Sequence, residues 1–137
     1  MDILVLNTKF ESVAILDRFE SLIWTDRFME CGDFEIYTAM DSALLQYIKQ
    51  DYYLYSADSE HMMIIEQLRV ETDSEDGNHL KILGRSLESI LDRRVIWGQK
   101  ILTGNLQDAI QMLLNENVIS PTIADRKISN FIFKKST

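Results

Sequence analysis

The acidic side chain best placed for chemistry is Glu66, which interrupts an otherwise apolar strand pattern. Alternate residues of a regular strand share one face. On that pattern Glu66 shares its face with four apolar residues: Met62, Ile64, Leu68 and Val70. A carboxyl group on an apolar face would have a raised pKa and could act as a general acid. Two structural alternatives are favoured over this one: a bulge that turns Glu66 outward, or a salt bridge to an arginine such as Arg85.

Thiol and imidazole chemistry has few candidates in this chain. Cys31 is the only cysteine, so no intramolecular disulfide can form. It could act as a nucleophile with a distant histidine, but a lone thiol beside a turn is more often structural. His61 and His79 are the only histidines, which nearly excludes a metal site made of Cys and His.

Phosphate, calcium and acyl-transfer motifs are also missing. The glycines at Gly84 and Gly98 lack the further glycines and the lysine of a phosphate-binding loop, and no G-x-S-x-G pattern occurs. The acidic segment from Asp73 to Asp76 lacks the alternating ligands and closing glutamate of a calcium loop, so we expect a solvated hairpin tip. We therefore expect no catalytic residue, no metal and no cofactor.

Tryptophans and arginines are the candidates for contacts with other chains. Trp24 lies in the middle of an alternating stretch and is expected in the core, whereas Trp97 follows Val95 and Ile96 and is the better surface candidate. Three arginines bracket a predicted helix around Leu87: Arg85, Arg93 and Arg94. In the structural interpretation, these arginines stabilise a helix end or pair with nearby acids. In the functional interpretation, they form ion pairs between chains, because Arg is enriched at interfaces.

Length and charge narrow the class of protein. The chain has 137 residues, 46% of them hydrophobic, which predicts one folded domain over residues 1–137. Its 14 Lys and Arg against 22 Asp and Glu give a net charge of −8. This balance argues against direct nucleic-acid binding and against docking on anionic membranes. No apolar run is long enough for a membrane anchor, and the N-terminus has no secretory signal pattern.

Hairpins dominate the predicted elements. Short strands are expected at Ile3–Leu6, Val13–Leu16, Tyr52–Tyr55 and Ile128–Phe133. A hairpin is expected over residues 21–38, with its turn near Gly32, and a second pairs Met62–Glu71 with Leu80–Leu83 around the Asp76–Gly77 turn.

Helices are expected at three places. A short one follows Asp41 or Ser42 and presents Leu44, Leu45 and Ile48. A second carries the stripe formed by Leu87, Ile90 and Leu91. The third begins after Asn105, whose side chain can accept the free amide hydrogens of the first turn, and its stripe comprises Leu106, Ala109, Ile110, Leu113 and Leu114.

These elements predict an α+β fold. Consecutive hairpins imply mostly antiparallel pairing, in a curved sheet or a small open β-barrel, with two or three short helices.

Two stretches together resemble a known family. The first is Trp24-Thr25-Asp26-Arg27-Phe28 followed by Gly32-Asp33-Phe34-Glu35-Ile36, and the second, more specific, runs from Gly84 to Arg94 as GRSLESILDRR. Linked by Met63-Ile64-Ile65-Glu66, they are similar to the N-terminal domain of the tail-hub (tail-associated, minor structural) proteins of siphophages and prophages of Gram-positive hosts. The resemblance extends from about Leu6 to about Phe133.

The resemblance implies a structural role in the virion tail, assembled in the bacterial cytoplasm. Barrel-like domains of such hubs form a ring around the tail channel, and family members are usually longer than this chain. The implied partners are other tail proteins (the distal tail ring, the tape measure and tail fibre parts), and a homotrimer is implied for the full-length protein. An acidic channel wall would let DNA pass without binding.

An exposed edge strand is the expected contact surface of such a ring component. Leu4 in the first predicted strand and Ile132 in the last are the candidates at these edges. Two other functions stay open: a small hydrolase with a paired-carboxylate site, and a small-ligand-binding barrel with an apolar cavity.

Overall fold

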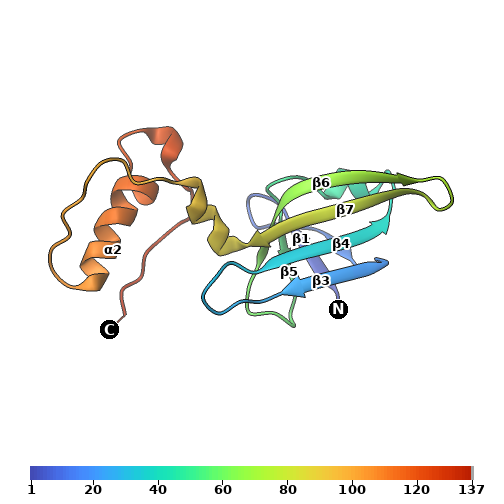
Figure 1. Cartoon of the computed structure of the whole chain (residues 1–137), viewed down its shortest axis with the longest axis horizontal. Coiled ribbons are helices and arrows are strands. Elements are labelled where there is room, and N and C mark those ends of the chain that lie inside the picture. The colour runs from blue at the N-terminus through green and yellow to red at the C-terminus, as the bar shows by residue number, and fades with distance from the viewer. Residues whose placement is uncertain (137) are drawn as a thin grey trace. The chain divides into compact units, whose positions relative to one another are not determined.

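The computed structural model of the chain describes residues 1–136 (Figure 1). It divides into two compact units, Met1–Ser89 and a second unit from Ile90 onward.

The first unit is a seven-stranded antiparallel sheet with the strand order β2-β1-β5-β6-β7-β4-β3. The strands are β1 (Ile3–Leu6), β2 (Ser12–Leu16), β3 (Ser21–Thr25), β4 (Asp33–Ala39), β5 (Tyr53–Tyr55), β6 (Met63–Asp73) and β7 (Gly77–Ser86), and α1 (Leu44–Tyr47) lies between β4 and β5 in the chain. Both predicted hairpins form, β3 with β4 and β6 with β7. The α+β prediction is confirmed, and the structure has the open sheet, one of the two forms that the prediction named.

The core of this unit follows the alternation of the strands. Along β4, Phe34, Ile36 and Thr38 are buried while the residues between them are half-buried. One cluster of buried side chains joins Ile3 and Val5 of β1 to Ile36 of β4, although these strands lie far apart in the sheet order. The sheet therefore curves around its core. Trp24 packs against this cluster, as expected.

The second unit is built from short helical segments. After the 3₁₀ helix η1 (Leu87–Arg93), the chain forms α2 (Leu106–Leu114), the π-helical turn η2 (Asn115–Ile119) and the 3₁₀ turn η3 (Ala124–Arg126). The predicted cap of α2 is confirmed, because Asn105 Oδ1 accepts the amide hydrogen of Asp108 at 2.9 Å. Within residues 1–136, no helix combines the length and the apolar character that crossing a membrane requires.

The two predicted edge strands are wrong. β1, which carries Leu4, pairs with β2 on one side and with β5 on the other, so it is an interior strand. The segment 128–133, which carries Ile132, forms no strand. Its β-favouring side chains have no partner strand to pair with, and Asn130 has a positive φ of 62°, which interrupts an extended backbone. The edges of the sheet are β2 and β3.

Candidate functional site

Glu66 lies at a β-bulge and pairs with Arg85, so both structural alternatives for it are confirmed. The register of β6 against β7 shifts between Ile65 and Gln67, leaving Glu66 as the extra residue. Arg85 Nε donates to Glu66 Oε2 at 3.0 Å, and Arg85 Nη2 donates to Glu66 Oε1 at 2.9 Å. A two-pronged arginine–carboxylate pair of this kind fixes the orientation of both side chains.

Ion pairs surround a groove on the same sheet. Lys81 Nζ lies 2.9 Å from Glu35 Oε1, and Arg27 Nη1 lies 2.6 Å from Asp33 Oδ2. The groove has a volume of about 450 Å³ and is lined by Ile23, Asp33, Phe34, Glu35, Glu66, Gln67, Leu83 and Gly84. Each lining carboxylate has a basic partner. General acid–base sites place two acids in contrasting environments. The acids of this groove are instead each paired with a cation, an arrangement that fits a structural surface better.

A second acidic group lies against a histidine. Glu88 Oε1 is 2.6 Å from His61 Nδ1. Burial raises the pKa of Glu88. Hydrogen bonds from Ser86 and from the Glu88 backbone amide, together with the contact with His61, lower the pKa by more than burial raises it. The pKa of Glu88 is therefore below its ordinary value of 4.5. This carboxylate is stabilised as an anion, which is opposite to what a general acid requires.

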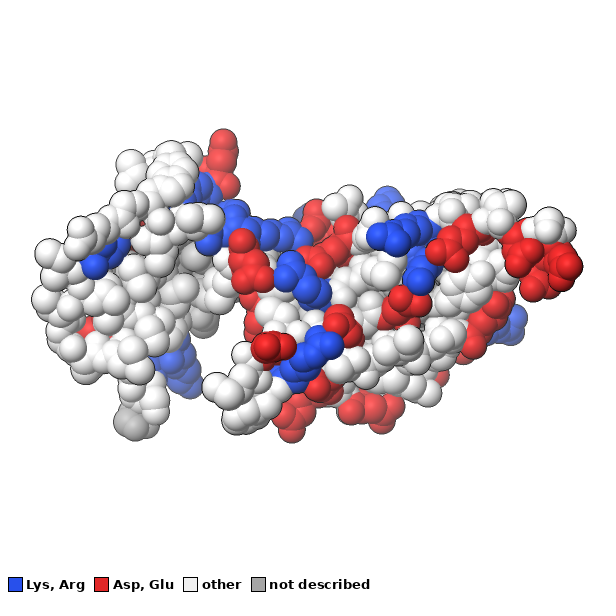
Figure 2. All heavy atoms as spheres, viewed as in Figure 1, with Lys and Arg blue, Asp and Glu red and all other residues white. Residues whose placement is uncertain are grey.

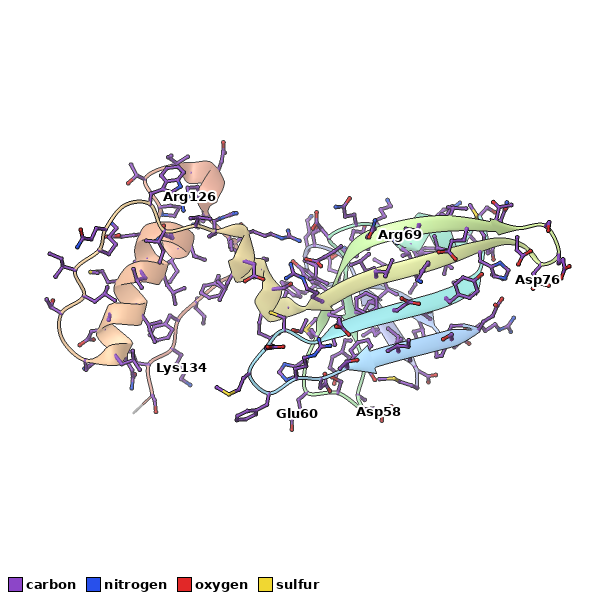
Figure 3. All side chains as sticks on the ribbon, viewed as in Figure 1. Asp58, Glu60, Arg69, Asp76, Arg126 and Lys134 are labelled. Atoms are coloured by element: carbon purple, nitrogen blue, oxygen red, sulfur yellow. The ribbon has the colours of Figure 1, made fainter. Side chains whose placement is uncertain are left out.

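The acidic hairpin tip is exposed, and the expected hairpin is confirmed. Asp73 faces Gly77 across the turn, and Gly77 has a φ of +85°, which favours glycine. Figure 2 shows acidic side chains gathered at this tip, and Figure 3 labels Asp76 there.

Acidic side chains near β4 affect Tyr37. Desolvation raises the pKa of Tyr37, and the negative charges of Glu71 and Glu20, followed by those of Asp73 and Asp76, raise it further. Within residues 1–136, no group of three or more His, Cys, Asp or Glu residues could hold a metal ion.

The proposed interface residues of the sequence analysis are divided between the two units. Leu4 is half-buried in β1, where it faces Ile15 and Tyr55. Arg85 is held by Glu66, and Cys31, the candidate nucleophile, is a half-buried free thiol in the loop between β3 and β4. The remaining interface candidates belong to the second unit.

In the second unit, Trp97 and Ile132 are exposed by 62% and 82%. Arg93 ends η1. Arg94 Nε donates to the Arg126 carbonyl at 2.6 Å, and Arg94 Nη1 donates to the Arg93 carbonyl at 3.0 Å. The exposed position of Trp97 confirms its assignment to the surface.

Arg126, which the sequence analysis missed, connects several segments of this unit. Its Nη2 donates to the carbonyl of Val95 at 2.7 Å and to Asn117 Oδ1 at 3.1 Å. Its guanidinium lies 4.2 Å from the centre of the Trp97 ring, a cation–π contact. Figure 3 labels Arg126 beside the helices of this unit. An arginine in irregular chain after Pro121 has no local pattern that distinguishes it from a solvent-exposed charge.

An apolar groove in the second unit was also missed. It has a volume of about 220 Å³ and is lined by Leu91, Arg94, Ile96, Ile110, Leu113, Leu114, Asn117 and Val118. The signal in the sequence was the apolar stripe of α2, which the sequence analysis recognised as helical without saying what covers it. In the structure, Ala109 of that stripe is buried, but Ile110 is exposed and Leu106 more so.

Comparison with known proteins gives one family. The profile of the siphovirus ReqiPepy6 Gp37-like proteins matches residues 2–136, nearly the whole chain. No curated protein matches the chain. The match confirms the resemblance to a siphophage protein family that Gly84–Arg94 and the Trp24–Ile36 region indicated. The chain belongs to the siphovirus ReqiPepy6 Gp37-like protein family.

Proposed function

We propose that this chain is a non-enzymatic structural component of the siphophage tail tip. In this proposal it forms part of a hub ring around the tail channel, between the distal tail ring and the parts that recognise the host or degrade its wall. The family match over residues 2–136 is the observation that carries the proposal. Other tail proteins are its partners, and the full-length protein is a homotrimer.

The surface of the first unit supports an assembly role. Its sheet has two edge strands, β2 and β3, each paired on one side only within the described residues. Ile15 on β2 and Ile23 on β3 are exposed. Unpaired edges with apolar side chains recruit neighbouring strands unless they are covered. These two strands replace Ile3–Leu6 and residues 128–133 as the proposed contact edges.

The alternative functions have less support. The carboxylates of the groove on the sheet are each held by a cation, which leaves the paired-acid hydrolase without a free acid there. A lipocalin-type site needs a closed barrel with an apolar interior, whereas this sheet is open.

Localisation in the particle tests the proposal. We would tag this chain in the phage genome, purify virions and detect the tag with gold-labelled antibody by electron microscopy. Gold confined to the tail tip, together with tails that fail to assemble when the gene is deleted, would support the proposal. Gold absent from purified particles, or normal infectious tails in the deletion mutant, would refute it. A tag on the major capsid protein serves as the labelling control.

A further inference from the structure

The second unit leaves an unusual amount of apolar surface uncovered. Among its described residues, the only buried hydrophobic side chains are Ala109 and Val118. Ten large hydrophobic residues are exposed: Leu91, Val95, Ile96, Trp97, Ile101, Leu102, Leu106, Ile110, Ile123 and Ile132. Exposed apolar surface of this kind marks an interaction site. The apolar groove, as defined by its lining above, lies within this surface.

The groove carries positive charge at its wall. Arg94 lines the groove, and its hydrogen bonds within residues 1–136 go to the backbone carbonyls of Arg93 and Arg126. Arg126 likewise donates to the Val95 carbonyl and to an amide oxygen. An apolar side chain accompanied by an acid would complement this groove.

Charge is divided unequally between the two units. Residues 1–89 contain 7 Lys and Arg and 18 Asp and Glu, a net charge of −11, and residues 90–137 contain 7 and 4, a net charge of +3. The two values sum to the −8 of the whole chain. Copies of this chain are therefore electrostatically complementary when the second unit of one copy meets the first unit of another.

The first unit presents an apolar projection that fits the groove. In the loop between β3 and β4, Phe28 is 101% exposed and Met29 is 87% exposed. Glu30 follows them and is exposed as well. A cavity of about 150 Å³ lined by Leu, Ile and Phe holds a benzene ring, so the groove's 220 Å³ accommodates one phenylalanine side chain.

The base of this loop is held by hydrogen bonds and by a close approach of two backbone segments. Arg27 Nη1 donates both to the Cys31 carbonyl at 3.1 Å and to Asp33 at 2.6 Å. Gly32 donates its amide hydrogen to Ser86 Oγ at 2.9 Å, and a Cβ at Gly32 would lie 2.3 Å from the Thr25 carbonyl oxygen. A loop ordered before binding loses less entropy on association.

We propose that the loop 26–32 of one copy inserts into the apolar groove of the second unit of another copy. Phe28 fills the groove, Met29 packs against the apolar surface beside it, and Glu30 meets Arg94. The contact joins two different surfaces, so it is heterologous and generates a ring when its rotation closes. As an account of how a hub ring is held together, this inference rests on the proposed function, although the contact itself is testable on the isolated chain.

The first test measures self-association. We would determine the average molar mass of the 137-residue chain by light scattering over a series of concentrations and at low and high salt. The expected result is a mass that rises above the monomer with concentration and falls with salt. Phe28→Ser combined with Met29→Ser should weaken association about tenfold or more. The matched control is Val70→Ser, an exposed apolar side chain on β6.

A charge exchange tests the pairing itself. Glu30→Arg alone and Arg94→Glu alone should each weaken association, whereas the double variant should restore it. Mixing the two single variants should also restore association, because one of them supplies Glu30 and the other supplies Arg94. Glu75→Arg at the hairpin tip is the control for a general loss of acidity. Circular dichroism verifies that every variant is folded.

Two outcomes would overturn the inference: a chain that remains monomeric at every concentration, or a loop variant that associates as tightly as the Val70→Ser control. A loop that binds the groove of its own chain belongs to the first outcome, because it gives a monomer. Neither outcome moves the gold label at the tail tip, so failure of this contact is distinguishable from failure of the proposed function.

Discussion

The Glu66–Arg85 pair forms because the bulge in β6 adds one residue between Ile65 and Gln67. Ile65 and Leu68 both contribute to the core although they are three positions apart, which a regular strand does not allow. The extra residue points to the cation on the neighbouring strand. A polar residue in this apolar strand therefore indicates a bulge, and the charge of Glu66 is neutralised by Arg85.

A double-mutant cycle measures the strength of this pair. Glu66→Gln and Arg85→Met, singly and together, are expected to give a coupling free energy of about 1 kcal/mol, because the pair is two-pronged but partly exposed to solvent. Urea unfolding provides the free energies. The same cycle on Glu35 and Lys81 should give a smaller coupling, since that pair has a single contact. Equal values for the two pairs would contradict the role assigned to the two-pronged geometry.

Glu88 is expected to make stability depend on pH. Its pKa in the folded chain lies below the ordinary 4.5, so its contribution is complete above pH 4.5 and is lost as the pH falls through the folded value. Glu88→Gln should therefore destabilise the chain at pH 6, and the difference from the native chain should disappear in more acidic solution. Urea unfolding across this pH range checks it, with Glu75→Gln as the exposed control. A difference that persists unchanged in acid would show that the charge of Glu88 is not responsible.

The β6–β7 hairpin brings two backbones close together at Gly84. A Cβ there would lie 1.9 Å from the Ile64 carbonyl oxygen and 2.7 Å from the Phe34 ring. Glycine is therefore required at this point of β7 by the approach of its neighbours. The same glycine opens the GRSLESILDRR stretch that carried the family resemblance, so part of that motif has a packing explanation.

Gly84→Ala is expected to lower the free energy of unfolding by about 1–3 kcal/mol, because the strand pair must separate to admit the methyl group. Urea unfolding followed by circular dichroism measures the change. Lys81→Ala, on the same strand but facing outward, should cost less than about 1 kcal/mol. A Gly84→Ala chain as stable as the native one would mean that the hairpin relaxes without cost.

The division into two units has a consequence for unfolding of the whole chain. The first unit has a large buried core, while the second buries Ala109 and Val118 among its hydrophobic side chains. Because burial of apolar surface is the main favourable term in folding, the second unit is expected to be the less stable.

The two tryptophans allow this to be measured on the full chain. Trp24 belongs to the first unit and Trp97 to the second. With Trp24→Phe, fluorescence reports the second unit, and with Trp97→Phe it reports the first. We expect the transition seen by Trp97 at a lower urea concentration than that seen by Trp24. Coincident transitions would show that the chain unfolds as one cooperative body.

Local signals in the sequence were sufficient to predict much of the secondary structure of the first unit and the position of α2. The Asp76–Gly77 turn predicts the β6–β7 hairpin, and Asn105 predicts the start of α2, because a turn glycine and a helix cap act within a few residues of the chain. Both structural alternatives for Glu66, a bulge and a salt bridge to Arg85, were also correct. These features depend on spacing that can be counted along the chain.

Strand order and open surface, by contrast, depend on partners distant in the sequence. Whether Ile3–Leu6 is an edge or an interior strand depends on where β5 pairs, and residues 128–133 lack a strand partner despite their composition. The apolar groove arises because the chain around α2 covers only part of its stripe. Residue types indicate which side chains prefer burial. Which of these side chains are actually buried depends on how segments distant in the sequence pack together in three dimensions.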